Sequence, residues 1–365
     1  MTDAAPIEIR APVVDAHLDL AHNAVAAGRD LRLPLDLLRD REARTAETAM
    51  VTWPELRDAG VDLVFGTLYA SPARRVPMQP AGPEEAPANA AASSDRTTGY
   101  VDAEGAHAQA LAQLRWYETM AAEGWIRIVR NRSDLGRLRR ERAASPTGPI
   151  GVVMLMEGAD PVRTPDEVQW WWEQGVRIIG PAWQGTRYAG GTRAPGPLTA
   201  LGRDLVDAMS SVGMALDVSH LADESLWQAL ELHRGAVLAS HSNARALTPT
   251  DRHLSDDALR ALGERDAVVG LVLGNAFLDA TAGRSGDVSL ARVGEHFEHV
   301  RTLVGAHRVG IGSDLDGGFG AEETPVELTR GRDFLRLADA VDAEHRASFL
   351  GAAWWSWLER SLPDT

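Results

Sequence analysis

The chain has 365 residues, a formal net charge of −15 and no cysteine. The acidic charge argues against a nucleic-acid partner, which would need a basic surface. The absence of cysteine excludes disulfides, thiol catalysis and thiolate ligands for zinc. All 37 basic residues are arginine, so chemistry that depends on lysine, such as a Schiff base or a carbamylated lysine between two metals, is excluded as well.

The sequence offers no candidate for secretion or membrane insertion. Its first segment, residues 1–12, has neither a basic start nor an apolar core, and a signal peptide requires both. No apolar stretch approaches the ~20 residues of a transmembrane helix. We therefore expect a cytoplasmic protein with no membrane partner.

Apolar runs recur along the chain and indicate buried strands, separated mostly by segments of helical character. The eight strands predicted in this way are residues 13–20, 61–70, 149–160, 175–183, 213–220, 235–243, 267–277 and 307–318. The helices predicted between them include residues 104–122, 199–212, 222–233, 255–264 and 289–304, and two more close the chain.

Alternation of strands and helices implies a parallel sheet, and eight repeats imply a closed (β/α)8 TIM barrel, here a single α/β domain over residues 1–365. The alternative, a doubly wound open sheet, would carry a glycine-rich fingerprint after the first strand, and none is present. A segment rich in proline and alanine, at about residues 71–100, breaks the pattern and is predicted to be a loop insertion. It is either a lid over a site at the strand ends or a tolerated surface insertion.

The first strand ends in His17-Leu18-Asp19. Residues two apart on a strand point to the same face, so the imidazole of His17 and the carboxylate of Asp19 are predicted to lie side by side. Such a pair is half of a divalent metal site. For this motif alone, a buried hydrogen bond that only stabilises the core is an equally good interpretation.

Polar residues also end four of the later strands. They are Glu157 on the third strand, His220 on the fifth, His241 on the sixth and Asp314 on the eighth. Barrel active sites lie at the carboxyl ends of the strands, so all of these side chains are predicted to converge. A single buried histidine is more often a core residue than a ligand, and aspartate is common in glycine-rich turns, but the whole set favours a metal site.

Many buried ionisable groups in one place need compensating charge, which two divalent cations would provide. Histidine and carboxylate ligands without thiolate suggest zinc, with manganese or cobalt as alternatives. Two cations would make a water between them acidic near neutral pH, and Asp314 is placed to accept its proton and pass it to a leaving group. The predicted ligand sets are His17 and Asp19 for one metal, His220 and His241 for the other, and Glu157 as the bridge.

The sequence resembles the membrane (renal) dipeptidase family, peptidase family M19, within the amidohydrolase-like metal-dependent barrels. The resemblance covers the chain from Val13 to the final helices. It implies two zinc ions, dipeptide substrates and commonly a homodimer. The segments that match the family motifs are His17-Leu18-Asp19, Glu157-Gly158, DVSH ending in His220, SHSN containing His241, GIGSDLDG containing Asp314, and RHLSDD beginning with Arg252.

The resemblance also bears on the residues that face the substrate. It implies that Arg252 binds the substrate carboxylate, which would select substrates with a free carboxyl terminus, although an arginine in a loop is more often a solvated surface group. Family members usually have a substrate-contacting histidine where Trp183 stands, and a tyrosine where Phe277 stands. The metal site is therefore predicted to be intact and the pocket altered, with Arg187 or Tyr188 as candidates to replace the lost group.

Three functions remain open from the sequence. The first is a zinc dipeptidase that cleaves small dipeptides, with tolerance of a D-residue at the C-terminal position; Arg252 favours it. The second keeps the metals but hydrolyses another small-molecule amide, lactam or ester, which Trp183 favours. The third is an inactive metal-binding scaffold, and the retained Asp314 argues against it. Tryptophans near residues 170–172 and 354–357 fit either a dimer contact or core packing.

Overall fold

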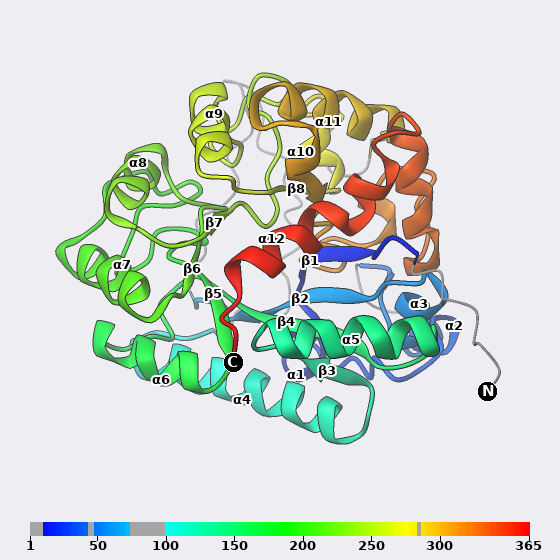
Figure 1. Ribbon diagram of the computed structural model, residues 1–365, viewed down its shortest axis with the longest axis horizontal. Coiled ribbons are helices and arrows are strands. Elements are labelled where there is room, and N and C mark those ends of the chain that lie inside the picture. Colours follow the sequence, from blue (N-terminus) through cyan, green and yellow to red (C-terminus); the bar gives the residue numbers. More distant parts are fainter. Residues whose placement is uncertain (1–9, 43–46, 74–98, 283–285) are drawn as a thin grey trace, which may run out of the picture.

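Parallel strands form a ring at the centre of the chain, with helices packed around it, as the computed structural model in Figure 1 shows. The structure describes residues 10–42, 47–73, 99–282 and 286–365. The strands are β1 (Val14–Leu18), β2 (Leu63–Tyr69), β3 (Ile126–Ile128), β4 (Ile150–Glu157), β5 (Val176–Gly180), β6 (Ala215–Asp217), β7 (Val237–Leu238), β8 (Val269–Leu271) and β9 (Val309–Ile311).

The pairing of the strands confirms the predicted (β/α)8 TIM barrel. Neighbouring strands are hydrogen-bonded in the order β7-β6-β5-β4-β2-β1-β9-β8. An isolated parallel bridge between Ala239 and Val269 joins the two ends of this series, so the ring is nearly closed. An open doubly wound sheet is excluded, because its outermost strands would not pair with each other.

Strand β3 has no counterpart among the eight predicted strands. It pairs with the first residues of β4, from Ile150 to Val152, ahead of the part of β4 that pairs with β5. β3 is three residues long and carries the half-buried Arg127 at its centre. It therefore lacks the apolar run by which the other strands are recognised.

Helices occupy the connections, and side chains that cap the first turn define several of their starts. The helices are α1 (Leu20–Val25), α2 (Leu35–Arg41), α3 (Trp53–Asp58), α4 (Ala103–Ala122), α5 (Arg132–Ala144), α6 (Val168–Glu173), α7 (Ala200–Val212), α8 (Asp223–Leu232), α9 (Asp256–Glu264), α10 (Asn275–Leu278), α11 (Leu290–Val304) and α12 (Ala353–Ser361). Asn131, Thr199 and Ser255 accept backbone hydrogen bonds at the starts of α5, α7 and α9. Gly213 ends α7 in the left-handed region, with φ of 81°. No helix in the described part of the chain has the length and apolar character needed to cross a bilayer.

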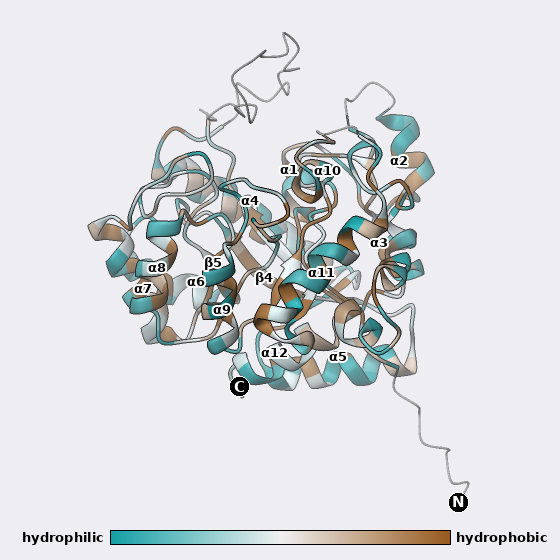
Figure 2. Cartoon of the chain, turned by 90° about the horizontal axis from the view of Figure 1, so that it is seen from above, coloured by the Kyte–Doolittle hydropathy of each residue, from teal (hydrophilic) through white to brown (hydrophobic). Residues whose placement is uncertain are grey.

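Two apolar layers hold the barrel together. The larger lies between the strands and the helices and includes Val152 of β4, and Figure 2 shows that the outer helices mix hydrophilic and hydrophobic residues, as helices that bury one side do. The smaller includes Val153 of β4 and Trp354 of α12. Because adjacent strand residues face opposite sides, this second layer fills the interior of the barrel. Trp357 donates to the carbonyl of Val237, the first residue of β7, so α12 closes the amino-terminal end of the barrel.

The predicted loop insertion at about residues 71–100 falls mainly on residues 74–98, which lie outside the described residues. Its described ends meet, because the backbone N–H of Ala73 donates to the carbonyl of Tyr100 and that of Tyr100 donates to the carbonyl of Ser71, both at 2.9 Å. The choice between a lid and a surface insertion stays a prediction.

The two tryptophan clusters have different surroundings. Trp170 is 38% exposed while its neighbour Trp171 is fully buried. Trp354, Trp355 and Trp357 are all buried. Core packing therefore accounts for the second cluster, and only the first offers an exposed ring.

Candidate metal centre

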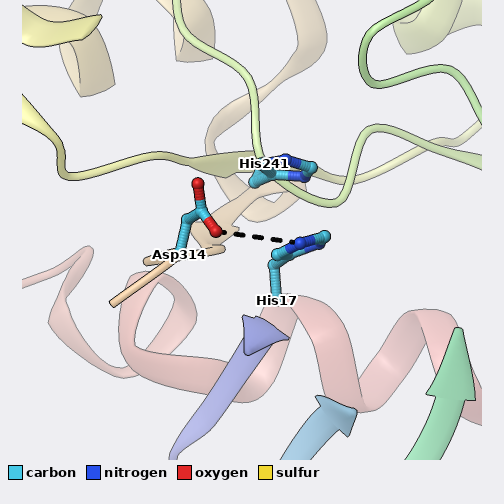
Figure 3. A group of neighbouring side chains, drawn as sticks. All are labelled: His17, His241 and Asp314. Atoms are coloured by element: carbon cyan, nitrogen blue, oxygen red, sulfur yellow. Dashed lines mark ion pairs between the residues drawn. The ribbon is translucent and has the colours of Figure 1, made fainter. Parts of the chain in front are cut away.

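The residues predicted to converge meet at the carboxyl ends of the barrel strands. His17 lies in β1, and Glu157 is the last residue of β4. His220, His241 and Asp314 each lie three residues beyond the end of their strand, β6, β7 and β9 respectively. Figure 3 shows His17, His241 and Asp314 gathered at one point.

Asp19 comes close to His17 through a local structure that differs from the predicted one. Strand β1 ends at Leu18, and Asp19 precedes helix α1 with a φ of −79° and a ψ of 41°. Its Oδ1 nevertheless lies 3.9 Å from Nε2 of His17. The hydroxyl of Thr67 on β2 donates to the same oxygen. The turn out of the strand, and not the alternation of side chains along it, brings the pair together.

Glu157 stands between two groups of ligand atoms. Its Oε1 lies 3.0 Å from Nε2 of His220 and 3.4 Å from Nε2 of His241. Its Oε2 lies 3.6 Å from Nε2 of His17, which in turn neighbours Asp19. Ligand atoms about 2.0–2.2 Å from one zinc ion are at most ~4.4 Å apart. These distances fall within that limit, so Glu157 belongs to two groups, each of the size of a single-ion site.

Asp314 lies beside both groups. Its Oδ1 is 3.8 Å from Nε2 of His17, the ion pair drawn in Figure 3. Together with His17 and His241 it forms a third set of atoms that could hold a cation. The backbone N–H of Asp314 donates to the carbonyl of His17 at 3.1 Å, which ties the end of β9 to β1.

The hydrogen bonds of the three histidines leave ring nitrogens that fit a cation. Nε2 of His17 is buried and has no hydrogen-bond partner among the described residues. Nε2 of His220 and Nε2 of His241 face each other at 3.0 Å. Their Nδ1 atoms lie 3.1 Å and 2.8 Å from the hydroxyls of Thr192 and Ser240. An imidazole that donates from Nδ1 presents a lone pair at Nε2, and two lone pairs this close repel unless a proton or a cation lies between them.

The charges of the carboxylates work against one another in this small volume. Burial and then the neighbouring Glu157 raise the pKa of Asp19. Burial, with Asp19 and Glu157 adding to it, raises the pKa of Asp314 well above its usual range. Burial lowers the pKa of His17, but Glu157, Asp314 and Asp19 outweigh it and raise that pKa to about 10. Divalent cations would supply the positive charge that offsets these buried carboxylates.

The other two histidines are shifted in the opposite direction. Burial, followed by the positive charge of Arg252, lowers the pKa of His220 to about 4. Burial, followed by His17 and Arg252, lowers the pKa of His241 well below its usual range. Both rings are therefore neutral at pH 7, which is the form that binds a metal ion. Imidazole and carboxylate ligands without sulfur fit zinc.

Two of the site residues have strained backbone. His220 has a φ of 67° and Asp314 a φ of 59°. Positive φ is uncommon outside glycine, costs free energy and collects at functional sites. The surrounding hydrogen bonds must therefore hold both residues in place.

Arg252, predicted to face the substrate, lies against the second group of ligands. It is buried, and it donates to the carbonyl of His241 at 2.6 Å and to the hydroxyl of Ser242 at 3.2 Å. Its Nε has no partner among the described residues. Its guanidinium carbon lies 5.7 Å from the centre of the Phe277 ring, so Phe277 also borders this place. The arginine is not a solvated surface group.

Trp183 lies beside His220 and Tyr69. Its ring centre is 6.4 Å from that of His220 and 5.2 Å from that of Tyr69. Arg187 and Tyr188, the predicted substitutes for the missing histidine, both donate to the carbonyl of Val162. These hydrogen bonds tie both side chains to the loop after β4, and their role as substitutes for the histidine stays a prediction.

Three hydroxyl side chains that hold the ligands were not predicted from the sequence. They are Thr67 for Asp19, Thr192 for His220 and Ser240 for His241. Ser240 precedes His241 in the SHSN segment, so this motif contained a hydroxyl that could have been predicted to contact the histidine. Thr192 lies in a glycine-rich loop far from His220 in the chain, and no pattern links them.

The sequence matches the model of the membrane dipeptidase family, peptidase family M19, over residues 1–340. A curated relative from Klebsiella pneumoniae, described as an uncharacterized protein in the pqqA 5′ region, is 32% identical over 204 residues, which are 53% of this chain and 73% of that protein. The matches to curated proteins described as dipeptidases span only 24% to 28% of the length of those proteins.

Two solved structures are similar over nearly the whole chain. A dipeptidase described as a metallopeptidase of family M19 is 26% identical, has a TM-score of 0.76 and is matched over 97% of this chain and 99% of its own. A metallopeptidase from Rhodobacter sphaeroides, solved with a phosphinate mimic of the dipeptide L-Ala-D-Ala, is 25% identical, has a TM-score of 0.75 and is matched over 96% of this chain and 99% of its own.

Proposed function

The chain belongs to the membrane dipeptidase family, peptidase family M19, and from this premise we propose that it hydrolyses the peptide bond of small dipeptides with two divalent metal ions, zinc by preference. The observation that carries the proposal is the position of Glu157, whose two carboxylate oxygens face two separate groups of ligand atoms. The dipeptide mimic bound to the similar Rhodobacter sphaeroides metallopeptidase supports dipeptides as the substrate class.

The ligands follow from the geometry of the two groups. His17 and Asp19 would hold one ion, His220 and His241 the other, and Glu157 would bridge them. Ions in these places would supply positive charge to polarise a scissile carbonyl and to make water more acidic.

Asp314 would carry the proton of the reaction. It would accept a proton from the attacking water at a carboxylate oxygen and deliver it to the amine nitrogen of the leaving group. An inactive scaffold would have no use for a carboxylate held in this strained position, so we do not favour that alternative.

Arg252 would bind the carboxylate at the C-terminal end of the dipeptide. A guanidinium has five N–H donors, and two hydrogen bonds to protein atoms leave others, including Nε–H, for a ligand. Its burial beside Phe277 keeps water away and strengthens a charge pair. Substrates with a free carboxyl terminus would therefore be preferred.

A different amide, lactam or ester is the second candidate substrate. It is favoured by Trp183, whose indole lies beside His220. An indole shapes a pocket but brings no charge to a developing oxyanion, and the loss of an oxyanion donor typically lowers the rate by ~10²–10³.

Turnover of a panel of L-L and L-D dipeptides tests the proposal, with zinc-reconstituted protein whose metal content is quantified in the same sample. Each dipeptide has a matched control in its carboxyl-amidated form. We expect cleavage of the free dipeptides and much weaker cleavage of the amides. Two bound metals without dipeptide cleavage would favour the second candidate substrate, and protein that binds no metal would contradict the proposed site.

A further inference from the structure

One hydroxyl group lies between the two groups of predicted ligands. Oγ of Ser240 is 2.8 Å from Nδ1 of His241 and 3.3 Å from Nδ1 of His17. His17 belongs to the group that contains Asp19, and His241 to the group that contains His220. A single side chain therefore touches one histidine from each group.

Asp217 decides the direction of these hydrogen bonds. Ser240 donates its hydroxyl proton to Oδ2 of Asp217 at 2.5 Å, and Oδ1 of Asp217 accepts the backbone N–H groups of Ser240 and Ser219, each at 2.9 Å. With its proton given to the carboxylate, the hydroxyl oxygen can only accept from the two imidazoles. Both His17 and His241 must then donate from Nδ1, which leaves the lone pair of each Nε2 free for a metal.

We propose that Ser240 is a positioning residue shared by the two metal sites, through which Asp217 fixes the Nδ1–H form of His17 and of His241 at the same time. The inference rests on the metal centre proposed above. A group on the far nitrogen of a metal-binding histidine typically changes metal affinity by about 10–100-fold. Because one hydroxyl serves both histidines, its loss weakens the binding of both ions.

Two matched variants separate this role from the general loss of a hydroxyl. Thr192 contacts Nδ1 of His220 only, so Thr192→Ala should affect one ion. Ser210 lies 3.0 Å from Nδ1 of His233, the same kind of contact outside the metal centre, so Ser210→Ala should affect neither.

The experiment is a titration of metal-free protein with Zn²⁺ in competition with a chromophoric chelator, which gives a dissociation constant for each of the two ions. We expect Ser240→Ala to raise both constants by about 10–100-fold, Thr192→Ala to raise one, and Ser210→Ala to raise neither. Ser240→Ala protein that keeps both constants, or loses affinity for one ion only, would overturn the inference. Wild-type protein that binds fewer than two ions would instead refute the metal centre itself.

A second measurement needs no variant, and it tests the Nδ1–H form of both histidines even if the Ser240→Ala protein does not fold. In zinc-loaded wild-type protein, nitrogen-detected NMR of the histidine rings should show His17 and His241 bound through Nε2. Each should carry an Nδ1–H proton in slow exchange with solvent and close to the Ser240 side chain. Coordination of either ring through Nδ1 would overturn the inference.

Discussion

The imidazole rings of His17 and His241 are stacked, with their centres 3.6 Å apart and their planes inclined by 28°. Two protonated imidazoles at this distance would repel each other strongly in a buried place. Burial and then His17 indeed lower the pKa of His241 well below its usual range. The stacked pair can therefore hold at most one proton charge, whereas both rings can be neutral metal ligands.

Removal of the metals should destabilise the protein. A ligand that binds only the folded state contributes about 4 kcal/mol at a concentration of 1,000 Kd. We expect the Tm to fall on treatment with a chelator and to recover with Zn²⁺. Mg²⁺ is the control, because it prefers oxygen ligands and should not restore the Tm. A Tm that is the same with and without chelator would argue against a metal centre in the folded protein.

Asp314→Asn should lower turnover strongly and leave the metals in place. Asparagine tolerates the left-handed backbone that Asp314 adopts, with its φ of 59°, so the fold should survive. Without a carboxylate to carry the proton, kcat should fall by ~10²–10⁴. Metal content should remain near that of the wild type. Loss of a metal from the variant would show that Asp314 is a ligand and not the proton carrier.

Arg252→Ala should raise KM for dipeptides with a free carboxylate. A hydrogen bond to a charged group contributes about 1.5–3 kcal/mol, which corresponds to a change of ~10–100-fold. Carboxyl-amidated dipeptides should be affected much less. Arg260→Ala is a suitable control, because Arg260 forms an exposed ion pair with Asp257 at 2.7 Å. An unchanged KM for the free dipeptides would remove the role assigned to Arg252.

Protonation of His233 should contribute to acid unfolding. Burial lowers its pKa to about 4, below the unfolded value of 6.5. Between these values the unfolded chain binds more protons, so stability falls as the pH drops from 6.5 to 4. For one buried histidine the loss amounts to at most ~3 kcal/mol. Denaturant unfolding of wild-type and His233→Gln protein at several pH values measures it; equal pH slopes for the two proteins would contradict the assignment.

The barrel could be predicted because its strands are continuous apolar runs, which is the pattern of parallel strands buried on both faces. The convergence of the candidate ligands could be predicted for a related reason, since each follows such a run and the carboxyl ends of the strands meet. β3 escaped prediction because three residues around Arg127 make no such run.

The hydrogen bonds that orient the candidate ligands could not be predicted, because they join strands that are far apart in the sequence and meet only in the barrel. Ser240 and His17 are 223 positions apart in the chain and touch only when the ring closes. The positive φ of His220 is likewise a property of the folded loop and cannot be predicted from the residue type. The sequence therefore indicates which side chains are candidate metal ligands, while the structure shows what orients them.

The most direct test of the two-metal centre is anomalous X-ray diffraction at the zinc edge from crystals of the zinc-loaded protein. We expect two peaks, one on each side of the Glu157 carboxylate, with Oε1 and His220 at one ion and Oε2 and His17 at the other. A single peak, or peaks away from Glu157, would contradict it.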